Sequence, residues 1–374
     1  MKYPKHVSIE LNEKEAINII ELSKDDKIKT NNLMTFFFKL FIIIIAFLIS
    51  FIIYLFINLK YYKNKLENIP KNIYQNHYNF DIIEYYKKSQ KDFCENPSKY
   101  INEKIEKEID LFDVKVDGLN YQIYIYKTFN WILHEIKLFG SYEKNVSNNM
   151  IEALKYYKKK NNILNNKDIF ILDIGGNIGW YPSLLGRYGY SILSFEAFEK
   201  NYYIEKKNVC LLNNDSNVIV ITKGLGNEEK NCHYFIQKKN EGNGMVVCDD
   251  KEILNNKWLA NQFIKKTDVE ITTLSNFIPY LSKKSMALMK LDVEGQELKI
   301  LEGGKELITE YHIPFVIIEF SPPYLKELGS EPYKLAQFFV DNGYKITIDG
   351  FLSKNYITIN QLIAHANYQI ISEN

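Results

Sequence analysis

Arginine is almost absent from this chain of 374 residues, which holds 46 lysines and a single arginine, Arg187. The planar guanidinium fork is the side chain best suited to read guanine edges and to clamp phosphates. Its scarcity argues against a sequence-specific nucleic-acid reader, and the formal net charge of +1 gives no general attraction to nucleic acid. We therefore expect no nucleic-acid partner.

Cysteine is also scarce, and the four residues are Cys94, Cys210, Cys232 and Cys248. None forms a CxxC pair, and no histidine cluster accompanies them at zinc-finger spacing, so the sequence assigns no metal ligands. Four cysteines over this length do not indicate a disulfide scaffold. We expect ordinary packed or free thiols, which leave the redox compartment open.

Charge is missing from the segment Leu40 to Ile57, which reads LFIIIIAFLISFIIYLFI. Its length as a helix is ~27 Å, close to the thickness of the hydrocarbon core of a bilayer. A buried core helix would not need to be apolar on every side, and a cleaved signal peptide would lie nearer the first residue. We therefore predict a polar tail at 1–32 and a single-pass transmembrane signal anchor at 33–59.

The orientation of this anchor is not decided by the positive-inside rule, because lysines flank both ends in equal number. Sequons at Asn145 and Asn214 would permit glycosylation, although an Asn-rich chain supplies such triplets by chance. We expect the C-terminal part on the lumenal side of an endomembrane such as the ER or Golgi.

Behind the anchor, residues 60–110 show no clean period and are interpreted as a stem, followed by a catalytic domain at 111–374. A hydrophobic content of 46% with 25% charged residues is typical of a globular domain. Two β-prone runs around Asp117-Gly118 predict a hairpin. Beyond Asn166, apolar strand-like runs alternate with helical patterns: IFILDI, YSILSFE, VIVIT, MALMKLD and FVIIEF. This alternation predicts an α/β domain with a mainly parallel sheet.

The run IFILDIGGNIGWYPSLLG, from Ile169, predicts a buried strand, a glycine turn and a helix that begins near Trp180. Glycines let the backbone approach a ligand closely, which is typical of a nucleotide-type cofactor site at the carboxyl edge of a sheet. The dinucleotide pattern G-x-G-x-x-G fails here, since Asn177 and Trp180 stand where glycines are needed.

The acid before the turn, Asp173, suits a cationic cofactor better than a pyrophosphate. Glu196 ends the next strand and is placed to accept hydrogen bonds from ribose hydroxyls. These features favour S-adenosylmethionine (SAM) over other nucleotide ligands and over a purely structural turn. The residues assigned to cofactor binding are Asp173, Gly175, Gly176, Asn177, Gly179 and Glu196.

A second strand-like run, MALMKLDVEGQELKILEGG, places Asp292, Glu294 and Glu297 at the same predicted edge. Exposed surface charge is the simpler interpretation of these acids, but their position beside the cofactor residues favours a functional role. Glu319 ends the strand FVIIEF, which should be buried on both faces, so its carboxylate needs a partner. It either pairs with Lys290 or lines the acceptor pocket.

These motifs resemble the FkbM family of SAM-dependent methyltransferases over residues 167–345. The segments that carry the resemblance are LDIGGNIG (172–179), FEAF (195–198), KLDVEGQE (290–297), LEGG (301–304) and IIEF (317–320). GSYEKN, with Glu143, resembles the segment just upstream, so the likeness begins near residue 110. Phe198 departs from the family pattern, which usually carries proline there. The resemblance implies a Rossmann-like fold, SAM as cofactor and O-methylation of a variable acceptor.

The working hypothesis is in-line methyl transfer to a hydroxyl acceptor, such as a glycan, a lipid or a small metabolite. Asp292 is the first candidate for the carboxylate that removes the hydroxyl proton, followed by Glu294 and Glu319. Two alternatives stay open. A type II membrane glycosyltransferase shares the anchor and stem, although it would want an Asp-x-Asp motif. A membrane-tethered binding module could retain an inactive methyltransferase domain.

Overall fold

The computed structural model describes residues 6–11, 81–128, 130–212, 217–238, 240–248, 257–281 and 285–372. The predicted transmembrane segment at 33–59 lies outside these residues. Among the described helices, none is both long and apolar enough to span a bilayer. The described residues fall within one compact unit, which comprises residues 1–13 and 82–374.

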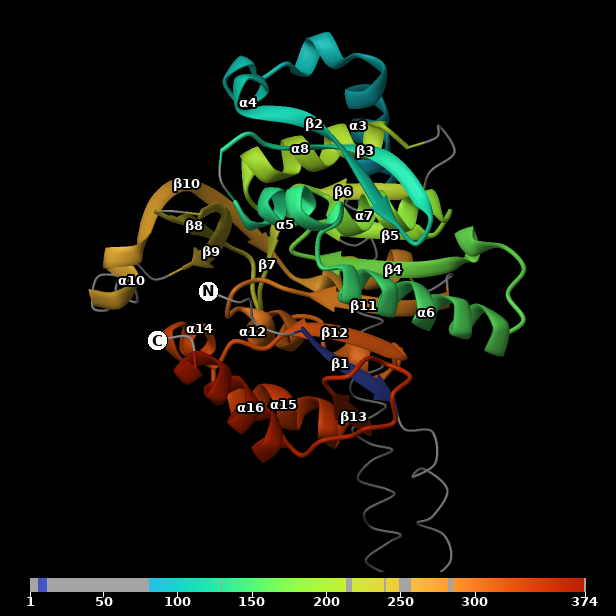
Figure 1. The fold of residues 1–374 in the computed structure, drawn as a ribbon, viewed down its shortest axis with the longest axis vertical. Helices are drawn as coiled ribbons and strands as arrows, with labels where there is room; N and C mark the ends of the chain where they lie inside the picture. Colours follow the sequence, from blue (N-terminus) through green and yellow to red (C-terminus); the bar gives the residue numbers. More distant parts are fainter. Residues whose placement is uncertain are drawn as a thin grey trace, which may run out of the picture. The chain divides into compact units, whose positions relative to one another are not determined.

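A seven-stranded sheet forms the centre of this unit (Figure 1). Its order is β13 (Tyr344–Thr347), β1 (His6–Leu11), β12 (Phe315–Glu319), β11 (Ser285–Leu291), β4 (Ile169–Ile174), β5 (Ser191–Phe195) and β6 (Val218–Ile221). The strands from β12 to β6 are parallel, as the alternating pattern predicted. All five apolar runs named above form strands of this sheet, which confirms a mixed α/β fold with a parallel core.

The first described strand, β1, was not predicted and lies between β12 and β13, antiparallel to both. Figure 1 shows it in blue, next to strands from the other end of the chain. The polar-tail interpretation of residues 1–32 gave this segment no structure, since a six-residue strand carries little local signal. Its pairing depends on partners about 300 residues away, which no local pattern reveals.

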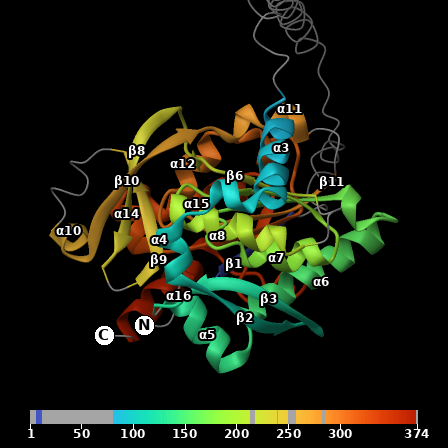
Figure 2. The same ribbon diagram turned by 90° about the horizontal axis from the view of Figure 1, so that it is seen from above.

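Two smaller sheets accompany the central one. The first contains β7 (Gly224–Leu225), β10 (Phe263–Thr272), β8 (Lys230–Gln237) and β9 (Asn240–Val247), in that order. The second is the hairpin of β2 (Ile109–Val116) and β3 (Leu119–Tyr126), whose turn at Asp117-Gly118 was predicted. Both views place β8, β9 and β10 at one end of the molecule, away from α6 (Figure 2).

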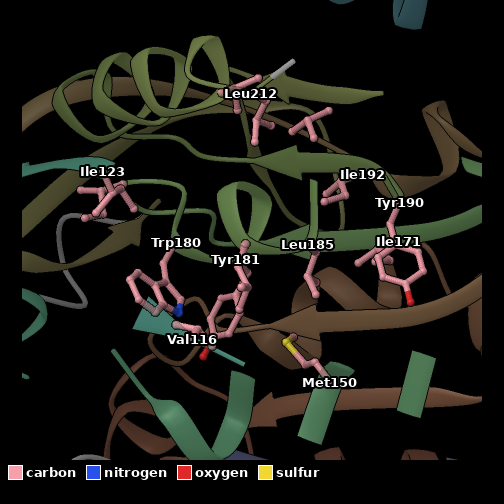
Figure 3. Packing of buried hydrophobic residues seen from close by; sticks show 14 of the residues in the cluster. Val116, Ile123, Met150, Ile171, Trp180, Tyr181, Leu185, Tyr190, Ile192 and Leu212 are labelled. Atoms are coloured by element: carbon pink, nitrogen blue, oxygen red, sulfur yellow. The ribbon is translucent and has the colours of Figure 1, made fainter. Parts of the chain in front are cut away.

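Helices cover both faces of the central sheet. The described helices of the chain are α3 (Ile82–Glu95), α4 (Glu103–Glu108), α5 (Trp131–Phe139), α6 (Lys144–Lys160), α7 (Trp180–Arg187), α8 (Glu199–Cys210), α10 (Lys257–Gln262), α11 (Ile278–Leu281), α12 (Glu297–Glu302), α13 (Glu306–Thr309), α14 (Pro322–Glu327), α15 (Pro332–Asp341) and α16 (Ile359–Ser372). Of these, α4 contacts β2 and α10 contacts β10. Alternate residues of β4 enter two different cores. Ile171 packs with α6, α7 and the β2–β3 hairpin (Figure 3), while Leu172 packs with the C-terminal helices.

The predicted boundary at residue 111 lies inside this compact unit. Helix α3, within the predicted stem, packs against α8 and β6. Its buried residues Tyr86, Gln90 and Phe93 form the inward side. The stem interpretation failed for this helix because its many lysines and glutamine hide a narrow apolar stripe. The domain therefore extends at least to Ile82.

Both pairs of cysteines form disulfides, so the expectation of ordinary packed or free thiols is wrong. Cys94 of α3 is bonded to Cys210 of α8, with their Cα atoms 5.3 Å apart and a sequence separation of 116. Cys232 of β8 is bonded to Cys248, just after β9, with a Cα separation of 4.3 Å. A bond depends on this spatial proximity, which the spacing of four cysteines along a sequence does not reveal.

Candidate active site

The glycine turn follows β4 directly and is locked against its neighbours. Gly175 has a φ of +87°, and a Cβ atom built on it would lie 1.9 Å from the carbonyl oxygen of Asp292. The backbone N–H groups of Gly175 and Gly176 both donate to the carbonyl of Phe195, at 2.9 and 3.0 Å. Helix α7 then begins at Trp180, as predicted. The turn therefore requires glycine and joins the ends of β4, β5 and β11.

Glu196, just after β5, faces the turn. Its Oε2 accepts a hydrogen bond from the backbone N–H of Asn177 at 2.7 Å, and its Oε1 accepts one from Phe198 at 2.7 Å. Burial raises the pKa of Glu196 to about 7, although these two backbone N–H groups oppose the rise. The carboxylate is thus fixed in one orientation, with lone pairs left on each oxygen for further donors.

A cavity with an empty volume of about 880 Å³, which includes space open to solvent, adjoins the turn. Its polar lining includes four of the residues assigned to cofactor binding, namely Gly175, Gly176, Asn177 and Glu196, together with the acidic Asp292. Apolar walls come from Phe195, Leu225, Val246 and Ile300.

Asp173 and Gly179 lie outside the lining of this cavity. Asp173 is 2% exposed and sits in register with Lys290 of the neighbouring strand β11. Burial raises the pKa of Asp173 to about 6, against the opposing effect of the Lys290 ammonium. Asp173 is therefore buried in the strand that leads into the turn and does not line the cavity.

Glu205 of α8 is a buried acid that the sequence analysis missed. A Cβ atom on Gly176 would lie 2.6 Å from its Oε1, and one on Gly179 would lie 2.7 Å from its Cγ. Burial raises the pKa of Glu205 well above its usual range. Glu205 begins the run Glu-Lys-Lys, which is typical of a solvated helix face, so no local signal in the sequence indicated its burial.

Three carboxylates meet at the same edge of the sheet, as the sequence predicted. Asp292, Glu294 and Glu319 each place one oxygen within 4.8 Å of the others. Lys290 Nζ donates to Asp292 Oδ2 at 2.9 Å, so the lysine pairs with this acid. The alternative pairing of Lys290 with Glu319 is therefore not adopted.

Burial raises the pKa of both Glu294 and Glu319 well above the usual range, and neighbouring carboxylates raise each further. Burial alone would lower the pKa of Lys290, but Asp292 and Asp173 outweigh it and keep this lysine charged.

Glu297, in the same motif, has a structural role. Its Oε1 accepts from the N–H groups of Val293 and Gly295, at 3.2 and 3.1 Å.

A glycine turn and an acidic strand end, joined at the carboxyl edge of a parallel sheet, are typical of a nucleotide-type ligand site in an α/β fold. Residues 173–346 match the family model described as "Methyltransferase FkbM domain". This match confirms the resemblance to the FkbM methyltransferase family over these residues.

Two curated relatives are named as methyltransferases. "Methyltransferase 1" of Beauveria bassiana (strain ARSEF 2860) is 32% identical over 146 residues, which cover 36% of this chain and 58% of the relative. "Methyltransferase sdnD" of Sordaria araneosa is 28% identical over 200 residues, which cover 48% of this chain and 75% of the relative. The chain therefore spans less than two thirds of the length of the first relative.

Proposed function

We propose that this protein transfers a methyl group from SAM to the hydroxyl of an acceptor molecule. The observation that carries the proposal is the cavity beside the glycine turn, which Glu196 enters from one strand end and Asp292 from another. The family match and the two relatives named methyltransferase support methyl transfer as the reaction.

The cavity fits SAM in both charge and hydrogen bonding. Asn177 Oδ1 is buried without a hydrogen-bond partner among the described residues and lines the cavity, so an acceptor waits there for a donor from the ligand. Glu196 offers lone pairs to ribose hydroxyls. Asp292 and Glu294 line the same space and supply the acidic surroundings that a sulfonium favours.

When bound, SAM supplies a methyl group on a positively charged sulfur, which leaves as a neutral thioether. The acceptor oxygen forms the new bond to carbon while the carbon–sulfur bond breaks and its electron pair returns to sulfur. Asp292 is the carboxylate that takes the hydroxyl proton, since it lines the cavity and is held by Lys290. Holding the two reacting atoms in line supplies much of the rate.

Titration calorimetry of the detergent-solubilised full-length chain with S-adenosylhomocysteine tests this proposal. We expect Glu196→Gln to weaken binding by roughly 10- to 100-fold, because hydrogen bonds to a charged group are lost. Glu310→Gln, at an exposed position, is the matched control and should leave binding unchanged. NAD and nucleotide sugars are the competing ligands. Binding of a nucleotide sugar instead, or equal affinity in both variants, would overturn the proposal.

We also propose that the protein is attached to a membrane through residues 33–59 and that its domain folds in an oxidising compartment. Two disulfides among the four cysteines support the second part, since disulfides persist in oxidising compartments and are rare in the cytosol. Alkylation of intact cells followed by peptide mapping without reductant provides the test. We expect the linked pairs Cys94–Cys210 and Cys232–Cys248, and four alkylated cysteines would contradict a lumenal domain.

A further inference from the structure

A second cavity, with an empty volume of about 490 Å³ that includes open space, adjoins the cofactor cavity. Both cavities are lined by Asn177, Asp292 and Glu294, so they meet at the strand end that holds the acids. The second cavity adds Glu319 and Asn240 to its lining. It therefore lies where the acceptor end of the reaction would be.

The charge around this cavity is unbalanced. Asp292, Glu294 and Glu319 lie together, and Lys290 supplies one ammonium, through Asp292. No basic side chain lines the second cavity in the part of the chain that the structure describes. Glu143 adds another carboxylate to the lining, although its Oε2 accepts from the hydroxyl of Tyr181. Asp292 and Glu294 are partly buried and Glu319 is buried, so mutual repulsion of their carboxylates is costly unless a cation or protons compensate it.

Oxygens from other elements are also left without donors. Asn240 of β9 is 8% exposed, and its Oδ1 has no hydrogen-bond partner among the described residues. Glu319 is 4% exposed, and its Oε2 likewise has no hydrogen-bond partner among the described residues. Buried polar atoms are normally paired. Unpaired oxygens from β9 and β12 that line one cavity therefore indicate a missing ligand to which these oxygens would bind.

We propose that Asp292, Glu294 and Glu319 bind one divalent metal cation of the Mg²⁺ type, with the amide oxygen of Asn240 beside it. Such cations prefer oxygen donors, while the cluster offers no sulfur or imidazole of the kind that zinc and copper favour. Oxygens on opposite sides of one ion are ~4–5 Å apart for Mg²⁺ or Ca²⁺. The three carboxylate oxygens of the cluster lie within 4.8 Å of one another, which is close enough for one ion to bind all three.

The consequence for catalysis rests on the proposed function. A cation held by Asp292 and Glu294 borders the cofactor cavity, so it can bind the acceptor oxygen and lower the pKa of its hydroxyl. The proton then leaves more readily as the new carbon–oxygen bond forms. The spacing of cysteines and histidines along the sequence does not reveal this site, because its donors are carboxylates from separate strand ends.

The experiment measures metal binding by itself. The full-length chain is stripped with a chelator, dialysed, and titrated with MnCl₂ while free Mn²⁺ is followed by electron paramagnetic resonance. We expect one site in the native protein, competed by Mg²⁺ more strongly than by K⁺. Glu319→Gln should weaken Mn²⁺ binding at least about tenfold, since it removes a charged ligand of similar volume. Glu294→Gln is the second variant in case the first misfolds, and Glu310→Gln is the control.

Binding of S-adenosylhomocysteine, measured on the same preparations, separates this proposal from the proposed function. Retained cofactor binding with no Mn²⁺ bound at millimolar concentration overturns the metal site alone. Equal Mn²⁺ affinity in the native protein, Glu319→Gln and Glu294→Gln overturns it as well. Loss of Mn²⁺ binding in both variants is the expected result. Cofactor affinity should stay within about threefold of the native value in Glu319→Gln, because Glu319 does not line the cofactor cavity.

Discussion

The glycine turn and the carboxylate cluster lie side by side at one sheet edge, yet they differ in how their polar groups are satisfied. At the turn, both oxygens of Glu196 accept backbone hydrogen bonds, and the first two glycine N–H groups are also paired. In the cluster, Glu294 Oε2 and Glu319 Oε2 have no partners among the described residues. The turn leaves one side-chain oxygen, Asn177 Oδ1, for a ligand, whereas the cluster leaves two carboxylate oxygens unpaired among the described residues.

The largest expected effect is at the turn. Gly175→Ala forces a methyl group onto the carbonyl of Asp292 and strains a φ of +87°. We expect cofactor binding to be lost and the free energy of unfolding to fall by ~3 kcal/mol or more. Gly118→Ala is the matched control, since its φ of +81° is similar but nothing lies within 4 Å. The free energy of unfolding should fall by only ~1 kcal/mol in this variant, which is the strain of alanine in the left-handed backbone region. Chemical denaturation measures both, and equal losses would show that the contact with Asp292 is unimportant.

The two disulfides brace the two regions separately. Cys94–Cys210 holds α8, which carries Glu205 behind the turn, while Cys232–Cys248 holds the β8–β9 hairpin that carries Asn240. In the chain-entropy model, the longer loop makes the first bond worth roughly 1–2 kcal/mol more than the second. Double Cys→Ser variants, compared by urea denaturation, measure this difference. The first pair should cost more stability and the second should weaken Mn²⁺ binding more, and the reverse order would contradict this division.

The smallest expected effect is the pH dependence of cofactor binding. The pKa of Glu196 is raised to about 7, so the folded protein keeps a proton that the unfolded chain releases near pH ~4.3. The contribution of Glu196 to stability is therefore lost as pH rises from about 4 to about 7. Ribose hydroxyls favour the carboxylate, so cofactor affinity should rise with pH and level off above 7. Calorimetry should show a decline of about tenfold from pH 8 to pH 6. Glu196→Gln should be weaker and insensitive to pH, and a pH response retained in this variant would assign it to another group.

The parts of the fold that sequence analysis predicted share one physical property. Central parallel strands are buried on both faces, so β4, β11 and β12 appear as continuous apolar runs that end in acids at a common edge. The meeting of Gly175, Glu196 and Asp292 followed from that topology. The turn at Asp117-Gly118 could also be predicted, because its signal lies in adjacent residues of the sequence.

What sequence analysis missed depends on distant partners. Strand β1 is specified by strands near the other end of the chain, and the disulfides by the approach of α3 to α8 and of β8 to β9. Asp173 was placed at the cofactor because it ends an apolar strand, but it is buried in that strand and does not line the cavity. Glu205 lies on a helix whose burial comes from the hairpin and turn that cover it.

The place of β1 in the sheet has a topological consequence. Its residues His6–Leu11 exchange backbone hydrogen bonds with β12 and β13, so they must occupy the same side of any membrane as the methyltransferase domain. One crossing between residues 33 and 59 would leave them on opposite sides. This pairing and a single span thus exclude each other in the same molecule. Reporter tags at the two chain ends would choose between them: protection of both from protease, or cleavage of both, favours the strand.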